Sequence, residues 1–153
     1  MKKNIWLRDE LKKFERRTAL TPKGVKACLE AGINVVVEES QNRCFSTNEY
    51  ADLGCEIVKS GSWVNAPEDT IILGLKEFPE EDTSPLHHTH IQFAHCYKNQ
   101  SNDKDTLKRF QSGGGTLYDI EFLMNEDNRR IAAFGYWAGF AGAAVAVDIY
   151  YHQ

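Results

Sequence analysis

The sequence predicts an α/β domain in which a mostly parallel sheet is covered by helices on both faces. Several apolar runs, such as residues 70–75 and 91–94, are nearly continuous. Such runs are typical of strands that are buried on both faces, as they are in parallel sheets. Short helices with recognisable first and last residues separate the runs, and the strand-helix-strand order recurs along the chain. Together these observations favour an α/β architecture.

The individual elements follow from capping residues and apolar runs. Thr21 followed by Pro22 combines an N-cap with a first-turn proline, and Gly32 ends the helix that begins there. Ser46 and Glu49 form a capping box at the start of a second helix. The predicted strands are residues 4–7, 33–37, 55–58, 70–75, 91–94 and 116–118, and a third helix with Ser101 as its N-cap precedes the last strand.

The composition indicates an ordinary globular protein. The 153 residues are 42% hydrophobic and 26% charged, with a formal net charge of −4. This charge gives no basic surface for nucleic acid or an anionic membrane, so we expect partners of neither kind. Four cysteines without a C-x-x-C motif predict reduced thiols and a cytoplasmic location. The apolar stretch at residues 138–147 is too short to span a membrane.

We predict one domain over residues 1–135, followed by a helix of small residues over residues 136–153. Alanine and glycine dominate this last segment, which suits close packing against a large surface. An apolar helix of this kind would be an adhesive surface if exposed, so we expect it to be buried. Trp6, Trp63 and Trp137 are likewise expected in the core.

Titratable residues follow two of the predicted strands. Lys76 and Glu77 come after residues 70–75, and His95 comes after residues 91–94. In open α/β sheets, reacting groups collect where strands end. Lysine and histidine there exchange protons near neutral pH if the pKa of the lysine is lowered. The structural alternatives are a solvated lysine-glutamate pair and a hydrogen-bonded core histidine.

Two further patterns resemble ligand sites without meeting their requirements. His87, His88 and His90 are clustered, but no further ligand lies nearby in the sequence, so we expect no metal. Residues 113–115 and the spacing of Gly139 and Gly142 are glycine-rich. Neither lies between a strand and a helix in a G-x-G-x-x-G motif, so we expect no cofactor to be bound by this chain.

Five motifs, spread over essentially the whole chain, carry a family resemblance. Residues 15–22, ERRTALTP, resemble the E-x-R-x-A-L-T-P signature of the alanine dehydrogenase and transhydrogenase N-terminal domain family. Within that family, the chain is similar to the lysine-forming saccharopine dehydrogenases at ILGLKE (72–77), HIQFAHCYK (90–98), TLYD (116–119) with Glu121, and RR (129–130) with AAFG (132–135). The resemblance implies a Rossmann-like or flavodoxin-like three-layer domain.

The resemblance also implies an activity and roles for particular residues. The family cleaves saccharopine to lysine and 2-oxoglutarate with NAD as the hydride acceptor. By position, it implies acid-base catalysis by Lys76 and His95, support from Glu15, Glu77 and Glu121, and substrate binding by Arg17, Lys98 and Arg130. Within this set, Glu15 is expected to pair with Lys76, and the two arginines are expected to hold substrate carboxylates, which a planar guanidinium binds through two hydrogen bonds.

Members of this family have a second domain that carries the dinucleotide fingerprint, which is missing from these 153 residues. We therefore expect NAD only through another domain and no hydride transfer by this chain alone. A fragment, one subunit of a split enzyme and a natural short homologue all remain open. The expected partners are a small-molecule substrate, an NAD-domain chain or a second copy. The alternative function is a stand-alone, non-redox protein that binds or acts on a 2-oxoacid, an amino dicarboxylate or an imine.

Overall fold

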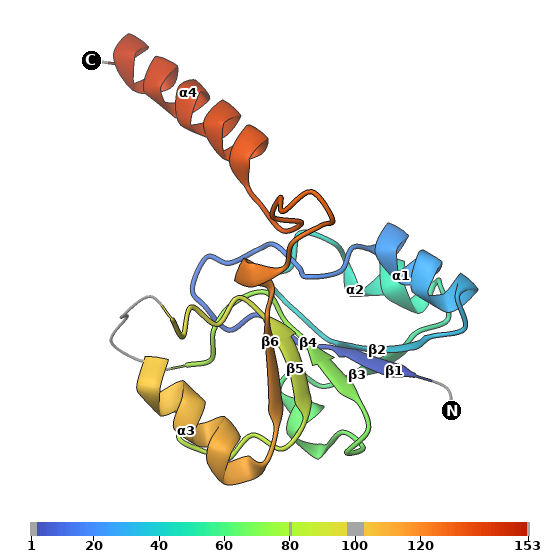
Figure 1. Cartoon of the computed structure of the whole chain (residues 1–153). Helices are drawn as coiled ribbons and strands as arrows, with labels where there is room; N and C mark the ends of the chain where they lie inside the picture. Colours follow the sequence, from blue (N-terminus) through green and yellow to red (C-terminus); the bar gives the residue numbers. More distant parts are fainter. Residues whose placement is uncertain (1–2, 80, 98–102, 153) are drawn as a thin grey trace. The chain divides into compact units, whose positions relative to one another are not determined.

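The computed structural model describes residues 3–79, 81–97 and 103–152, and its centre is a six-stranded, entirely parallel sheet (Figure 1). The strand order is β3-β2-β1-β4-β5-β6. The strands are β1 (Asn4–Leu7), β2 (Asn34–Glu38), β3 (Glu56–Val58), β4 (Ile71–Leu73), β5 (Thr89–Gln92) and β6 (Thr116–Asp119). The predicted α/β class with a parallel sheet is confirmed. Met1–Ile120, which contains the sheet, and Glu121–Gln153 form two compact units.

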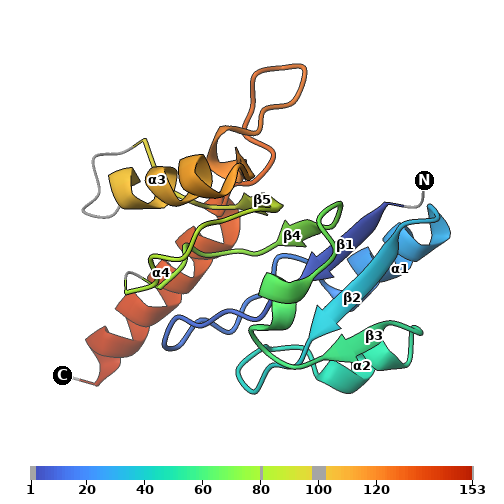
Figure 2. The same ribbon diagram turned by 90° about the horizontal axis from the view of Figure 1, so that it is seen from below.

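Helices cover both faces of the sheet (Figure 2). The elements are α1 (Pro22–Glu30) and α2 (Thr47–Ala51) on one face, and α3 (Asp103–Gly113) and the 3-10 helix η1 (Ser62–Asn65) on the other. The Thr21 hydroxyl accepts a hydrogen bond from the Gly24 N–H, and both bonds of the capping box at Ser46 are present. Gly32 has a φ of 77°, which allows the chain to leave α1. The predicted boundaries of α1 and the start of α2 are therefore confirmed.

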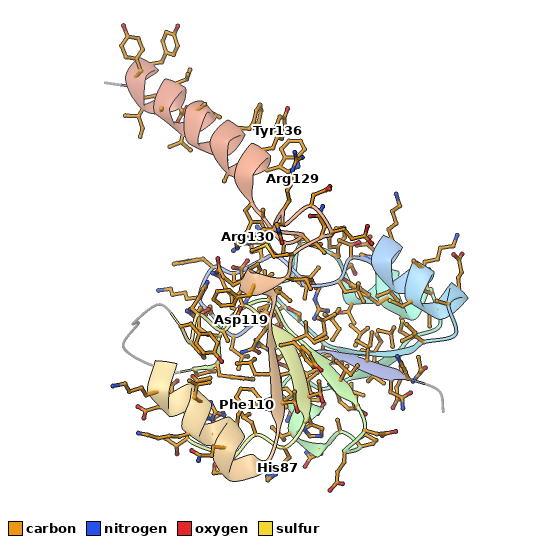
Figure 3. All side chains as sticks on the ribbon, viewed as in Figure 1. His87, Phe110, Asp119, Arg129, Arg130 and Tyr136 are labelled. Carbon is orange, nitrogen blue, oxygen red and sulfur yellow. The ribbon has the colours of Figure 1, made fainter. Side chains whose placement is uncertain are left out.

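Two apolar clusters fill the space between the sheet and its helices. Leu7 and Val37 pack with Val25 of α1 on one face. On the other face, Ile72 packs with Trp63 of η1 and with Phe110, which lies between α3 and the sheet (Figure 3). Burial on both faces explains why β2 and β4 are apolar at consecutive positions, Val35–Val37 and Ile71–Leu73, rather than at alternate ones.

β2 and β3 begin one residue later than predicted, and the largest differences from the prediction are in β4 and β5. β5 pairs with its neighbours over Thr89–Gln92, so Phe93 and Ala94 follow the strand although both are buried. Their apolar character reflects burial after the strand end, where the Phe93 N–H donates to the Leu75 carbonyl. β4 similarly ends at Leu73. Ser101, the predicted N-cap of α3, lies outside the described residues.

The C-terminal unit consists of a turn and the helix α4 (Gly135–Tyr151). In the turn, the Asn125 side chain accepts hydrogen bonds from the N–H groups of Asp127 and Arg129. Residues 121–134 belong to the same compact unit as α4.

The helix α4 is apolar on all sides, and none of its residues is buried in the described chain. Trp63 is buried and Trp6 packs against the same cluster, whereas Trp137 is 72% exposed within the described chain. The expected burial of α4 stays a prediction. No helix among the described residues is both long and apolar enough to cross a bilayer.

Candidate active site

The candidate site lies where the strand order reverses. Successive strands after β1 are added on one side as β2 and β3, and on the other side as β4, β5 and β6. In doubly wound sheets, ligands bind beyond the carboxyl ends of the strands at this switch point. The residues that follow β1, β4 and β5 are Arg8–Glu10, Gly74–Glu77 and Phe93–His95. The predicted Lys76, Glu77 and His95 all belong to these segments.

Glu77 connects His95 to a lysine that the sequence analysis did not single out. Its Oε2 lies 3.8 Å from His95 Nδ1, and its Oε1 accepts a hydrogen bond of 2.5 Å from Lys12 Nζ. Burial raises the pKa of Glu77, but the hydrogen bond from Lys12 and the charges of Lys12 and His95 lower it further, and the net pKa is below the ordinary value. Glu77 is therefore a carboxylate near neutral pH, and it places a negative charge beside the His95 ring.

His95 has an unusual backbone conformation for a residue other than glycine. Its φ is 55°, in the left-handed region, which costs about 1 kcal/mol or more for a residue with a Cβ atom. Its ring stacks on the ring of Phe93, with a centroid distance of 6.1 Å, and remains one-fifth exposed. Backbone strain of this kind is concentrated at functional sites. This backbone conformation places the partly exposed imidazole of His95 just beyond the end of β5.

Glu15 forms its ion pair with Arg17 rather than with Lys76. Arg17 Nε and Nη2 donate to the two Glu15 oxygens at 2.8 and 2.7 Å. The expected Glu15–Lys76 pair is therefore wrong at the level of direct contact, because the guanidinium two residues away matches both oxygens. The hydrogen bonds from Arg17 are the main cause of the lowered pKa of Glu15, and the charge of Lys76 adds to them. Lys76 is thus close enough for electrostatic interaction, and among the residues that the structure describes none is hydrogen-bonded to its ammonium group.

The remaining predicted residues are in the C-terminal unit or outside the described residues. Arg130 Nη2 lies 2.7 Å from Glu121 Oε1, so these two predicted residues form an ion pair. Figure 3 labels Arg130 beside Arg129 in the turn that precedes α4. Lys98 falls in the part of the chain that is not described.

A buried polar network at the same strand ends was missed. Glu10 accepts hydrogen bonds from the N–H groups of Leu75 at 2.6 Å and Lys76 at 3.0 Å. Arg8 donates to the Lys76 carbonyl and, at 3.3 Å, to Gln92 Oε1. Burial raises the pKa of Glu10, although Arg8 and the two N–H groups oppose the rise. The signal was available, since Arg8–Glu10 directly follow a strand and belong at the edge where Lys76 was placed.

Neither glycine-rich segment leads from a strand into a helix. Gly113 ends α3 and Gly114 and Gly115 lead from it into β6, while Gly139 and Gly142 lie inside α4. A dinucleotide cradle needs the opposite order, a glycine-rich turn from a strand into a helix. His87 and His88 contact the carbonyls of Gly113 and Ala66 instead of sharing a ligand. Within the described ranges, no group of three or more His, Cys, Asp or Glu side chains is arranged to hold a metal ion.

Comparison with known proteins gives a consistent family. Residues 6–141 match the family described as "Alanine dehydrogenase/PNT, N-terminal domain". Proteins named saccharopine dehydrogenase [NAD(+), L-lysine-forming] from Schizosaccharomyces pombe and Candida albicans are 52% and 56% identical over 98% and 94% of the chain. The match covers only 41% and 37% of those proteins, so the chain spans about two fifths of their length.

A solved L-alanine dehydrogenase has the same fold. It superposes with a TM-score of 0.65 over 82% of this chain and 34% of its own, at 22% sequence identity. At this identity the likeness concerns the fold alone, and it agrees with the Rossmann-like architecture of the sheet unit.

Proposed function

The chain belongs to the alanine dehydrogenase/PNT N-terminal domain family, and from this premise we propose that it is the substrate-binding half of a saccharopine dehydrogenase-like oxidoreductase. The observation that carries the proposal is the meeting of Lys76, Glu77 and His95 at the carboxyl ends of β4 and β5, beside the switch point of the sheet. The identity to proteins named as lysine-forming saccharopine dehydrogenases supports the substrate.

The proposed reaction needs several proton transfers. The secondary amine of saccharopine loses a hydride and a proton to become an imine, water adds to the imine carbon, and the carbinolamine collapses to lysine and 2-oxoglutarate. NAD accepts the hydride in the overall reaction. The share proposed for the residues of this chain is to bind the substrate and to move protons.

Lys76 and His95 are the proposed acid-base pair. A neutral amine or imidazole takes the amine proton, and the protonated form later donates to the collapsing carbinolamine. Glu77 places a negative charge beside His95, with its Oε2 3.8 Å from His95 Nδ1. Glu15, whose own pKa is lowered in part by the charge of Lys76, supports the pair from a greater distance. The roles of Glu121, Lys98, Arg17 and Arg130 stay as proposed from the family pattern, with the arginines as carboxylate ligands.

Calorimetric titration of the 153-residue chain tests this proposal. Saccharopine, 2-oxoglutarate, lysine and NAD are added separately, and each ligand that binds is repeated with Lys76→Ala and His95→Ala. Lys108→Ala is the matched control, because Lys108 is an exposed lysine of α3 in a local ion pair. We expect saccharopine or 2-oxoglutarate to bind without NAD and the two site variants to bind more weakly than the control.

Two other outcomes would contradict the proposal. If none of the four ligands binds, the chain is not a working substrate half. If a 2-oxoacid or an amino dicarboxylate binds but saccharopine does not, the non-redox alternative gains support. NADH formation from saccharopine and NAD, followed at 340 nm, gives a separate readout when an NAD-binding domain of a relative is added.

A further inference from the structure

Lys76 is held by an unusually complete set of backbone hydrogen bonds. The N–H groups of Leu75 and Lys76 both donate to Glu10, the Lys76 carbonyl accepts from Arg8, and the Leu75 carbonyl accepts from the Phe93 N–H. All four polar backbone atoms of this dipeptide therefore have partners, although it lies beyond the end of β4. Side chains from the segment after β1 provide three of these four bonds.

The side chains that make these bonds are themselves rigidly placed. Arg8 and Glu10 are more than nine-tenths buried, with Arg8 Nη1 3.7 Å from Glu10 Oε2. The Arg8 guanidinium also lies 5.0 Å from the centre of the Phe78 ring and donates to Gln92 at the end of β5. The pair thus joins the ends of β1, β4 and β5.

Gly74 provides independent evidence that this arrangement is built into the sequence. A Cβ atom at Gly74 would overlap the Arg8 guanidinium, so only glycine leaves room for Arg8 against this strand end. The φ of Gly74 is not in the left-handed region, and the glycine is therefore required by space rather than by backbone conformation.

We propose that Arg8 and Glu10 are positioning residues that fix the backbone of Lys76 from both sides and so hold its side chain at the acid-base site; the proposal rests on the proposed function of Lys76. Burying a paired arginine and glutamate gives little net stability, because the loss of hydration offsets most of the attraction. Catalytic groups, by contrast, need to be held to within about 0.5 Å by buried hydrogen bonds. Positioning of Lys76 is therefore the role that accounts for this arrangement.

The test uses Glu10→Gln, which keeps the size of the side chain but removes one of its two acceptors. Glu38→Gln is the matched control, since Glu38 is also a fully buried carboxylate that accepts backbone N–H groups, from Asp9, Gly61 and Trp63, and does not contact Lys76. Two readouts are specific for Lys76. Amide hydrogen exchange follows its backbone, and the NMR signal of ¹³C-dimethylated lysine, assigned with Lys76→Arg, follows its side chain.

We expect Glu10→Gln to accelerate hydrogen exchange of the Leu75 or Lys76 amide at least tenfold relative to the Val37 amide, and to shift the NMR signal of dimethyl-Lys76. Glu38→Gln should leave both the exchange rates and the NMR signal unchanged, although it should lower the stability of the fold by as much as Glu10→Gln or more. If the Lys76 signal is unchanged in folded Glu10→Gln, or shifts as much in Glu38→Gln, the positioning role is refuted.

Gly74→Ala provides a second route if Glu10→Gln does not fold. The added methyl group displaces the Arg8 guanidinium without removing a charge, so the dimethyl-Lys76 signal should again move, and an unchanged signal overturns the proposal. Both readouts work without a ligand. A wild-type chain that fails to bind saccharopine therefore refutes the proposed function and leaves the hydrogen-bond measurement intact.

Discussion

The sheet unit, Met1–Ile120, and the C-terminal unit, Glu121–Gln153, differ in how much of their apolar surface is buried. In the sheet unit, carboxylates such as Glu38 and Glu10 are buried, each with several hydrogen-bond donors. In the C-terminal unit, apolar side chains such as Trp137 and Tyr150 are exposed, and no residue of α4 is buried. The sheet unit therefore has its own core and can organise a site. The stability of α4 has to come mostly from its helix propensity within the described chain.

The largest expected effect concerns the buried charge of the sheet unit. Glu38 accepts hydrogen bonds from Trp6 Nε1 and from the N–H groups of Asp9, Gly61 and Trp63, at 2.8–3.1 Å. Glu38→Ala leaves these four donors without their acceptor, and an unsatisfied buried donor costs about 1–3 kcal/mol. We expect a loss of about 4 kcal/mol in the free energy of unfolding, measured by urea denaturation. A loss below about 1 kcal/mol would show that the segments at Asp9 and at Gly61–Trp63 do not depend on this carboxylate.

The buried His90 should make the stability of the fold depend on pH. His90 is fully buried among Trp63, Phe78 and Phe110, and burial, with smaller effects from nearby positive charges, lowers its pKa to about 3. The unfolded chain takes up this proton near pH 6.5, so the stabilisation is complete above pH 6.5 and is lost as the pH falls toward 3. The slope is at most about 1.4 kcal/mol per pH unit.

His90→Leu should remove this part of the pH dependence. We expect the difference in unfolding free energy between pH 7 and pH 5 to be about 2 kcal/mol smaller in the variant than in the wild type. His152→Leu, at the exposed end of the C-terminal unit, is the control and should leave the difference unchanged. Equal pH dependence in His90→Leu and wild type would mean that His90 is not kept neutral by burial.

The contrast between the units also explains which features the sequence could predict. Helix caps at Thr21 and Ser46 involve residues within a few positions of each other, so local patterns identified them. The apolar run at residues 91–94 correctly indicated buried residues. The end of β5, however, is set by its pairing with β4 and β6, and local sequence patterns do not contain this information. Contacts such as Arg8 with Lys76, which are 68 positions apart, depend on the strand order.

The candidate site was also predicted only in part, because local patterns do not contain contacts between distant residues. Strand ends and the family resemblance placed Lys76, Glu77 and His95 correctly at one edge of the sheet. The resemblance could not provide the partner of each side chain, and Glu15 accordingly pairs with Arg17. For α4, apolar composition predicted burial, but apolar residues on all sides of a helix do not identify what covers it.

A smaller effect is expected for the two arginines that are proposed as carboxylate ligands. Arg130 forms an ion pair with Glu121 and donates to the Ala132 carbonyl, so it is oriented within its own unit. If it holds a substrate carboxylate, Arg130→Ala should weaken 2-oxoglutarate binding several-fold in calorimetry, as should Arg17→Ala in the sheet unit. Arg129→Ala, at the neighbouring turn position, is the control. Unchanged affinity for both site variants would remove the arginines from the proposed site, and a loss for Arg17→Ala alone would confine the site to the sheet unit.

The smallest effect is expected on α4 itself. Trp137 is largely exposed, and its ring contacts only nearby aromatic residues of the same helix among the ring contacts described, so Trp137→Ala removes little buried surface. For a monomeric chain with α4 exposed as described, we expect a change within about 0.5 kcal/mol in the unfolding free energy, whereas truncating a buried core tryptophan costs about 3–5 kcal/mol. Trp63→Ala in the sheet unit is the matched comparison, since Trp63 is buried in the second apolar cluster.

A loss of several kcal/mol for Trp137→Ala would mean that α4 is covered in solution, by another part of the protein or by a second copy. Repeating the measurement at two protein concentrations separates these cases, because only association makes the loss depend on concentration.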